Sequence, residues 1–135
     1  MRVLIDTNVL VSAIYSPKGT AFQAFEKAVT SPYQCLICDY CLDELRKTFL
    51  KKWPHKIRDV EMFIQAILPV IELILTPSEI HEDEEKVGDV DDRPILRAAI
   101  NAEADIIVTG DGVFLASDIE HPACAKTCNS AAKMI

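Results

Sequence analysis

The sequence predicts an α/β domain, a three-layer sandwich in which a mainly parallel sheet of roughly five strands lies between helices. Three observations support this fold class. Short apolar runs typical of buried strands alternate with amphipathic segments of helical spacing. No internal repeat or low-complexity stretch divides the 135 residues, so we expect one domain over residues 1–135. The first apolar run ends at Asp6 and a later one leads into Asp111, and ligands bind at this end of strands in parallel sheets.

The first half of the chain contains two expected strands and three expected helices. Residues 3–5 form the first strand, and the helix that follows it ends at the turn SPKG (16–19). The next helix begins with Thr20 as its cap. The helix after the second strand begins with Asp39 in the same role, and it stops before Pro54 because the residue before a proline disfavours helix.

The second half repeats the alternation. Pro69 interrupts a further amphipathic helix before an apolar run, and Pro94 suits the first turn of the last helix. The segment DIIVTGD (105–111) is again an apolar strand that runs into a carboxylate. We therefore expect strands at 3–5, 33–38, 70–75 and within 105–111, and helices at 7–16, 20–30, 40–52, 56–68 and 93–104.

The composition excludes several classes of protein. Half of the residues are hydrophobic and 26% are charged, and no apolar stretch reaches the roughly 18 residues of a membrane span. A strand begins at Arg2, where a secretory leader has its basic region, so we expect a cytoplasmic protein with reduced thiols. Cys35, Cys38 and Cys41 repeat every third residue. Small buried hydrophobes are their expected role, and a zinc site is the alternative.

The two strand-terminal aspartates need an explanation, because a carboxylate is costly to bury without a partner. Asp6 is either the cap of a helix that opens at Thr7 or part of a site that uses its charge. Asp111 has a similar alternative, since TGDG (109–112) is typical of a turn. Their common position after two strands favours one shared site at the carboxyl edge of the sheet.

Further carboxylates occur on the expected helices. Glu44 shares a helical stripe with Cys41, which draws it toward the core side, although a solvated face is the alternative. Asp89, Asp91 and Asp92 precede the last helix, and each can act as its cap. We select Asp92, because the inward face of that helix continues from it.

Carboxylates that lie close together repel one another unless they share protons or bind a cation. Mg²⁺ and Mn²⁺ prefer oxygen ligands, and such sites serve phosphodiester hydrolysis by activating water and neutralising the charge on phosphate. A bound metal also removes the objection that a net charge of −7 raises against a polyanionic substrate. The carboxylates therefore indicate a metal site directly, and they indicate a nucleic-acid substrate only because the bound metal would offset their charge.

Four segments resemble a known family in order and spacing. LIDTNVLVSA, DELRK, DVDDRPILRAA and ADIIVTGD are similar to the four acidic motifs of PIN-domain (PilT N-terminal) ribonucleases, and especially of toxins from toxin–antitoxin pairs. The resemblance implies that Asp6, Glu44, Asp92 and Asp111 form a catalytic quartet that binds Mg²⁺ or Mn²⁺. It also implies a parallel five-stranded sheet with the first and fourth strands adjacent.

The same resemblance implies further properties. Asn8 and Thr109 are then polar residues that support the site. The implied activity is that of an endoribonuclease on single-stranded RNA, with an antitoxin as protein partner and a homodimer as the assembly. The tail 121–135 matches no family pattern that locates a fifth strand.

Basic residues are concentrated in one stretch. Residues 46–58 hold six of the 14 lysines and arginines, and Lys47, Lys51 and Lys52 are the candidate contacts to RNA phosphates. Trp53 is a candidate ring for stacking a base. The alternative is a solvated face on which Trp53 is a buried anchor at the end of the helix.

Acidic residues are concentrated in another stretch, since residues 79–92 hold eight of the 21 aspartates and glutamates, and we expect this run to be exposed. Two other functions are alternatives to the nuclease. One is a PIN-like scaffold without catalysis. The other is an aspartyl-phosphate enzyme, which is disfavoured because no second acid adjoins Asp6 and IIVTGD ends in aspartate rather than lysine.

Overall fold

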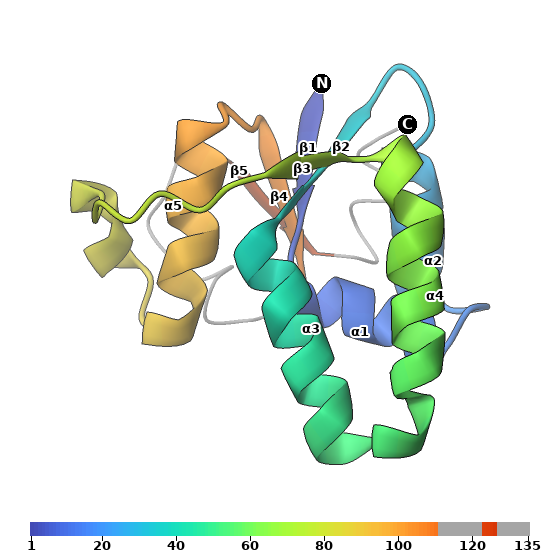
Figure 1. The fold of residues 1–135 in the computed structure, drawn as a ribbon. Coiled ribbons are helices and arrows are strands. Elements are labelled where there is room, and N and C mark those ends of the chain that lie inside the picture. Colours follow the sequence, from blue (N-terminus) through green and yellow to red (C-terminus); the bar gives the residue numbers. More distant parts are fainter. Residues whose placement is uncertain (111–122, 127–135) are drawn as a thin grey trace.

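Five parallel strands form the sheet of this computed structural model, which describes residues 1–110 and 123–126 (Figure 1). All neighbouring strands are parallel, and Ile5 pairs with Val108 where the first strand meets the fourth. The predicted α/β class and the adjacency of these two strands are therefore confirmed. The strands are β1 (Arg2–Ile5), β2 (Gln34–Cys38), β3 (Glu72–Ile74), β4 (Ile106–Thr109) and β5 (Ala123–Lys126), in the spatial order β3-β2-β1-β4-β5.

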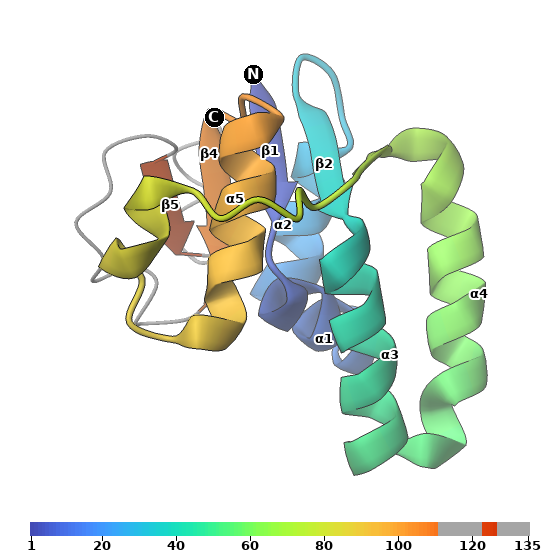
Figure 2. The same cartoon turned by 60° about the vertical axis from the view of Figure 1, so that its left-hand side comes forward.

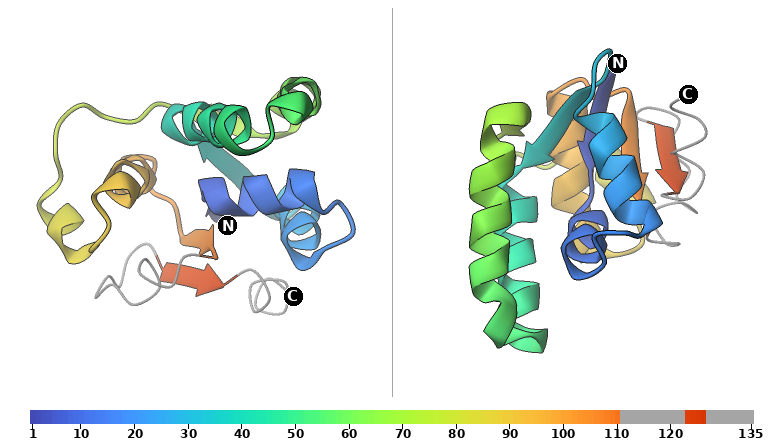
Figure 3. Two further views of the ribbon diagram at one scale, coloured as in Figure 1. Left: turned by 90° about the horizontal axis from the view of Figure 1, so that it is seen from below. Right: turned by 90° about the vertical axis from the view of Figure 1, so that its right-hand side faces the viewer.

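Helices cover both faces of the sheet. The α-helices are α1 (Thr7–Tyr15), α2 (Thr20–Ala28), α3 (Asp39–Lys52), α4 (Ile57–Ile67) and α5 (Arg93–Asn101). Figure 3 shows α1 and α2 on one face and α5 on the other, while α3 and α4 form an antiparallel pair that projects beyond the sheet (Figure 2). Short 3₁₀ segments occupy η1 (Pro54–Lys56), η2 (Leu68–Val70), η3 (Glu82–Lys86) and η4 (Val90–Asp92). No helix in the described ranges combines the length and apolar character needed to cross a bilayer.

The core lies on both sides of the central strands. Val3, Leu4 and Ile5 of β1 are fully buried, as expected for a parallel sheet covered on both faces. Cys35, Cys38 and Cys41 are free and buried as well, which agrees with the prediction of small hydrophobic residues. The Sγ atoms of the last two lie 3.2 Å apart. Among residues 1–110 and 123–126, no group of three or more cysteine, histidine or acidic side chains is arranged to hold a metal ion, so the zinc alternative gains no support.

The caps predicted at Thr20 and Asp39 are each wrong by one residue. Gly19 is the N-cap of α2, and Thr20 is its first helical residue. Cys38 is the N-cap of α3, because the strand and the helix follow each other directly. Asp39 stands in the first turn, where a negative charge is favoured by the helix dipole.

The Asp39 carboxylate has a tertiary role instead. Its Oδ1 accepts hydrogen bonds from the Thr76 amide (2.8 Å), the Thr76 hydroxyl (2.7 Å) and the Tyr40 amide (2.9 Å). Burial raises the pKa of Asp39, but these hydrogen bonds outweigh it and hold the pKa below its ordinary value. The carboxylate therefore ties the start of α3 to the chain just beyond β3.

Two other elements are shorter than predicted. The strand expected at 70–75 is reduced to β3, because Pro69 and Val70 belong to the 3₁₀ turn η2. The helix expected at 93–104 ends at Asn101, and Glu103 two residues later has a left-handed backbone with φ of 55°. A left-handed residue just after a helix is a common way to end it.

The sequence predicts that the acidic stretch is exposed, but the structure buries part of it. Part of it folds into η3, where Glu84 is 2% exposed. The Arg97 guanidinium of α5 donates Nε and Nη2 hydrogen bonds to the two Glu84 oxygens, over 2.9 and 2.8 Å. These bonds hold the pKa of Glu84 below its ordinary value against the opposing effect of burial. The pair fixes η3 to the outer side of α5.

Replacing Glu84 with glutamine should lower the free energy of unfolding by about 3 kcal/mol at pH 7, because the Arg97 guanidinium loses its charge partner in a largely buried position. The native pKa of Glu84 lies below its unfolded value of about 4.3, so the stabilisation is complete above that value. It is lost as the pH falls through the native pKa. Urea unfolding from pH 7 to pH 3 measures both effects, and the variant should lose less stability in acid.

Glu85→Gln is the matched control, since Glu85 is exposed on the same turn. Equal unfolding free energies for the two variants at pH 7 would contradict the prediction.

Candidate active site

Asp6 lies at the carboxyl end of the central strand β1, and it is 1% exposed. Its Oδ1 accepts a hydrogen bond from the Thr7 amide at the start of α1 (2.7 Å), so the predicted cap exists. Its Oδ2 accepts a hydrogen bond from the Thr109 hydroxyl at the end of β4, also over 2.7 Å. The amide of Asp6 donates to the Val108 carbonyl (3.0 Å), which holds the two strand ends together. The two strands thus position the Asp6 carboxylate jointly.

A cavity of about 170 Å³ opens at this edge of the sheet. Asp6 and Asn8 reach it from β1 and α1, Glu44 from α3, and Asp92 from the turn before α5. Four residues that the sequence placed in one site therefore line one cavity. Asp111, the fourth member of the predicted quartet, lies outside the described residues.

The three aspartates before α5 differ in burial. Asp92 is 8% exposed, whereas Asp89 and Asp91 are exposed, although all three line the cavity. Asp89 Oδ1 accepts a hydrogen bond from the Asp91 amide (2.9 Å) and thereby caps η4. This division of roles favours Asp92 as the site carboxylate of the three, and Asp89 as the residue that shapes its turn.

Tyr40 is a lining residue that the sequence did not single out. Its hydroxyl donates a hydrogen bond to the Asp91 carbonyl over 2.7 Å, which connects α3 to the turn that carries Asp92. Burial, and after it the negative charge of Glu44, raises the pKa of Tyr40, so the hydroxyl stays a donor at neutral pH. The sequence could have identified Tyr40 by its position four residues before Glu44, because this spacing puts both side chains on one face of a helix.

The donor set is chemically suited to a hard divalent cation. Asp6, Glu44 and Asp92 supply only carboxylate oxygens, and none of the described residues that line the cavity is a histidine. In the described part of the chain, however, no three acidic side chains converge as a preformed metal site. The arrangement fits Mg²⁺ better than an ion that needs a full protein cage, because Mg²⁺ keeps several water ligands between itself and a few carboxylates.

The predicted basic contacts divide into two groups. Lys47 lies beside the cavity, with its Nζ 3.8 Å from Glu44 Oε1 and a side chain that is 75% exposed. Lys51 and Lys52 are exposed in the last turn of α3 and do not line the cavity. The structure therefore brings only the first of the three close to the carboxylates.

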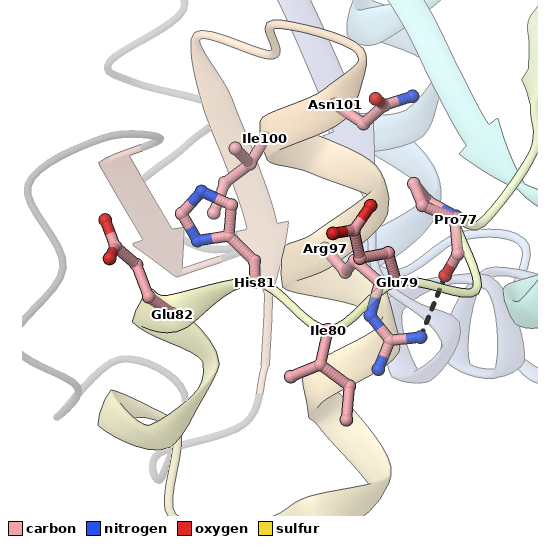
Figure 4. A pocket seen from close by; sticks show the side chains of 8 residues that line it. All are labelled: Pro77, Glu79, Ile80, His81, Glu82, Arg97, Ile100 and Asn101. Carbon is pink, nitrogen blue, oxygen red and sulfur yellow. Dashed lines mark hydrogen bonds between the residues drawn. The ribbon is translucent and has the colours of Figure 1, made fainter.

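A larger cavity of about 370 Å³ lies between the η3 region and α5 (Figure 4). Arg97 extends along it and donates a hydrogen bond to the Pro77 carbonyl over 2.8 Å. It contains none of the residues that the sequence placed in the site, and Arg97 is already paired with Glu84. The smaller cavity is the candidate site, because the carboxylates gather there.

Replacing Tyr40 with phenylalanine should loosen the turn that carries Asp92, because the hydrogen bond between α3 and η4 is removed at a cost of about 1 kcal/mol. Amide hydrogen exchange is the measurement. Faster exchange is expected at residues 89–92, with unchanged exchange in β1 and β2. Tyr33→Phe is the control, and equal exchange at 89–92 in both variants would refute the role given to the Tyr40 hydroxyl.

Solved structures of similar fold come from toxin–antitoxin systems. VapBC2 from Rickettsia felis, bound to a DNA fragment from its promoter, has 18% identity and a TM-score of 0.71, covering 93% of this chain and 98% of that one. DNA-bound VapBC from Salmonella typhimurium has 14% identity and a TM-score of 0.69, covering 95% and 99%. VapC20 from Mycobacterium tuberculosis, a toxin that cleaves the sarcin–ricin loop, has 12% identity and a TM-score of 0.59, covering 82% and 90%.

These identities show similarity of fold. A comparison with curated proteins gave no match. A comparison with family models matched residues 2–112 to the PIN domain, a range that includes β1 to β4 and every element that lines the candidate site. By this match the chain belongs to the PIN-domain family.

Proposed function

We propose that this chain is an endoribonuclease that hydrolyses phosphodiester bonds of single-stranded RNA with Mg²⁺ or Mn²⁺. One observation carries the proposal. Three carboxylates from separate elements, Asp6, Glu44 and Asp92, line one cavity at the carboxyl edge of the sheet. Gathering like charges in this way is unfavourable unless the groups share protons or bind a cation, and we infer that a bound cation offsets the repulsion here.

The metal would be held by Asp6, Glu44 and Asp92, and we assign Asp111 to the same group from the resemblance of its motif. When bound, a divalent ion activates water and neutralises charge on the scissile phosphate. The chain itself contributes a fixed orientation, since the Thr7 amide and the Thr109 hydroxyl hold the two oxygens of Asp6. Asn8 is exposed and lines the cavity, and in this proposal it donates a hydrogen bond to the substrate. In this proposal no side chain acts as a nucleophile.

We further assign the chain to the toxin side of a toxin–antitoxin pair, which acts in the cytoplasm. The similarity of fold to VapBC assemblies and to the toxin VapC20 supports this assignment. An antitoxin protein is accordingly the expected partner. The homodimer implied by the sequence resemblance stays a prediction.

The second candidate function is a PIN-domain scaffold without catalysis. It is favoured by one observation, namely that no three acidic side chains among the described residues are arranged as a complete metal site. Metal binding and RNA cleavage separate the two candidates.

Glu44→Gln should reduce the rate of RNA cleavage at least about a hundredfold, because a lost metal ligand removes several kcal/mol of transition-state stabilisation. Cleavage of a mixed-sequence single-stranded RNA in Mg²⁺ or Mn²⁺, with and without EDTA, is the measurement. Glu44 is the sharper test than Asp6, because Asp6 also caps α1 and bonds Thr109, and its loss affects folding. Asp43→Asn is the matched control, since its side chain is 70% exposed on the same helix.

Cleavage that EDTA and Glu44→Gln abolish, and that Asp43→Asn retains, would support the nuclease. If no form of the protein cuts RNA, titration calorimetry with Mg²⁺ or Mn²⁺ decides. If the native chain binds the metal and Glu44→Gln weakens this binding, the metal site is supported and the substrate is a different one. If the native chain binds no metal, the scaffold is favoured.

Expression of the native chain in a bacterial host should arrest growth if it is a toxin, and expression of Glu44→Gln should not. Colony counts after induction, with immunoblots to match protein levels, measure the effect. Equal growth arrest by both forms would show that toxicity does not depend on the carboxylates.

A further inference from the structure

Two aromatic rings and two lysines meet at the far end of α3. The rings of Tyr15 and Trp53 have centroids 4.7 Å apart. Lys56 Nζ lies 5.2 Å from the Tyr15 centroid, and Lys52 Nζ lies 5.9 Å from the Trp53 centroid. We call these four residues the tip cluster, because Lys52, Trp53 and Lys56 belong to the segment in which the chain turns from α3 to α4, and Tyr15, the last residue of α1, packs on Trp53. Figure 1 shows the turn from α3 to α4 at the end of the helix pair.

The two rings of the tip cluster differ in their surroundings. Trp53 packs against the fully buried Phe49, with centroids 5.2 Å apart, and this matches the prediction of an anchor at the end of the helix. Tyr15 rests on Trp53 and is 53% exposed. The exposed ring is thus held by an anchored one, and it is Tyr15, which the sequence did not single out, that faces solvent.

The cations around these rings are not neutralised by neighbouring acids. In the described part of the chain, Lys51, Lys52 and Lys56 form no ion pair, whereas Arg46 on the same helix pairs with Glu61 over 2.7 Å. This concentration of positive charge occurs in a chain whose net charge is −7. A local basic patch with an exposed ring has the composition of a single-strand nucleic-acid platform.

Building on the proposed ribonuclease function, we propose that the tip cluster is a second, non-catalytic binding site for the single-stranded RNA substrate. Tyr15 stacks on an unpaired base, and Lys52 and Lys56 bind the flanking phosphates. Among the described residues, the contact of the Lys56 ammonium is a cation–π contact with the Tyr15 ring, so Lys56 can turn to a phosphate as the base takes its place. An unpaired base is required, because the bases of a duplex are already stacked on one another.

Helix α3 sets the separation between the two sites. Glu44 and Lys52 are eight residues apart on it, which corresponds to about 12 Å at 1.5 Å per residue. A stacked strand advances about 3.4 Å per nucleotide, so three to four nucleotides bridge the gap. Lys47 lies beside Glu44 and provides a positive charge between the two sites. RNAs long enough to reach both sites should therefore bind more tightly than shorter ones.

Fluorescence anisotropy tests the tip cluster with labelled 12-nucleotide and 3-nucleotide single-stranded RNAs of mixed sequence, in EDTA so that no metal-dependent cleavage occurs. Tyr15→Leu should raise the Kd for the 12-nucleotide RNA at least about fivefold, the lower limit of the loss of one base stack. Tyr15→Phe is its matched control, which keeps the ring and should bind as the native chain does. The 3-nucleotide RNA should bind more weakly and should respond less to Tyr15→Leu.

Lys56→Gln should lower the slope of log Kd against log salt by about 0.7, the value for one phosphate contact to a single strand. Lys86→Gln is the charge-matched control on η3, remote from the tip cluster. Two results would overturn the proposal. One is a Kd for the 12-nucleotide RNA that Tyr15→Leu leaves unchanged, and the other is equal loss of affinity in Lys56→Gln and Lys86→Gln.

Binding in EDTA keeps this test separate from the test of catalysis. Weakened binding by Tyr15→Leu in a protein that cuts no RNA would support the second site and contradict the nuclease. Normal binding by Tyr15→Leu in a protein that cuts RNA through Glu44 would support the nuclease and contradict the second site.

Discussion

The fold depends on the burial of one carboxylate at the end of its central strand. Asp6 is almost fully enclosed, so its charge requires compensation from within the protein. The Thr7 amide, the Thr109 hydroxyl and the positive end of the α1 dipole supply it. The Thr7 amide and helix α1 follow β1 directly, but Thr109 belongs to β4. The pairing of β1 with β4 therefore also brings the Thr109 hydroxyl to the Asp6 carboxylate.

This requirement joins the architecture to the site. The carboxyl ends of β1 and β4 meet at one edge, and α3 and α5 begin near that edge, so Glu44 and Asp92 arrive beside Asp6 from different directions. Tyr40 then links two of the elements by its bond to the Asp91 carbonyl. Glu44 lies in the first half of α3, beside the other site carboxylates, and Lys51 and Lys52 lie in its last turn. The site carboxylates and these two lysines are thus separated along one helix.

What could be read from the sequence was mostly local. Strands of a parallel sheet are covered on both sides and appear as unbroken apolar runs, which is why β1, β2 and β4 were located closely. Asp6, Asn8, Glu44 and Asp92 were placed together by strand ends, helical stripes and family motifs, and they line one cavity. Features set by distant partners were missed. Glu84 is buried only because Arg97 on α5 meets it, and β5 (ACAK) contains no β-branched residue and becomes a strand by pairing with β4.

The hydrogen bonds of Asp39 have a mechanical consequence. They clamp the first turn of α3 to the end of β3, while the rest of the α3–α4 pair projects past the sheet. Glu44 lies one and a half turns from the clamp, and Trp53 lies nearly four turns from it. The clamp therefore sets the position of Glu44 relative to Asp6 and Asp92, whereas the outer end of the helix is positioned by a different contact, the packing of Trp53 on Phe49 and Tyr15.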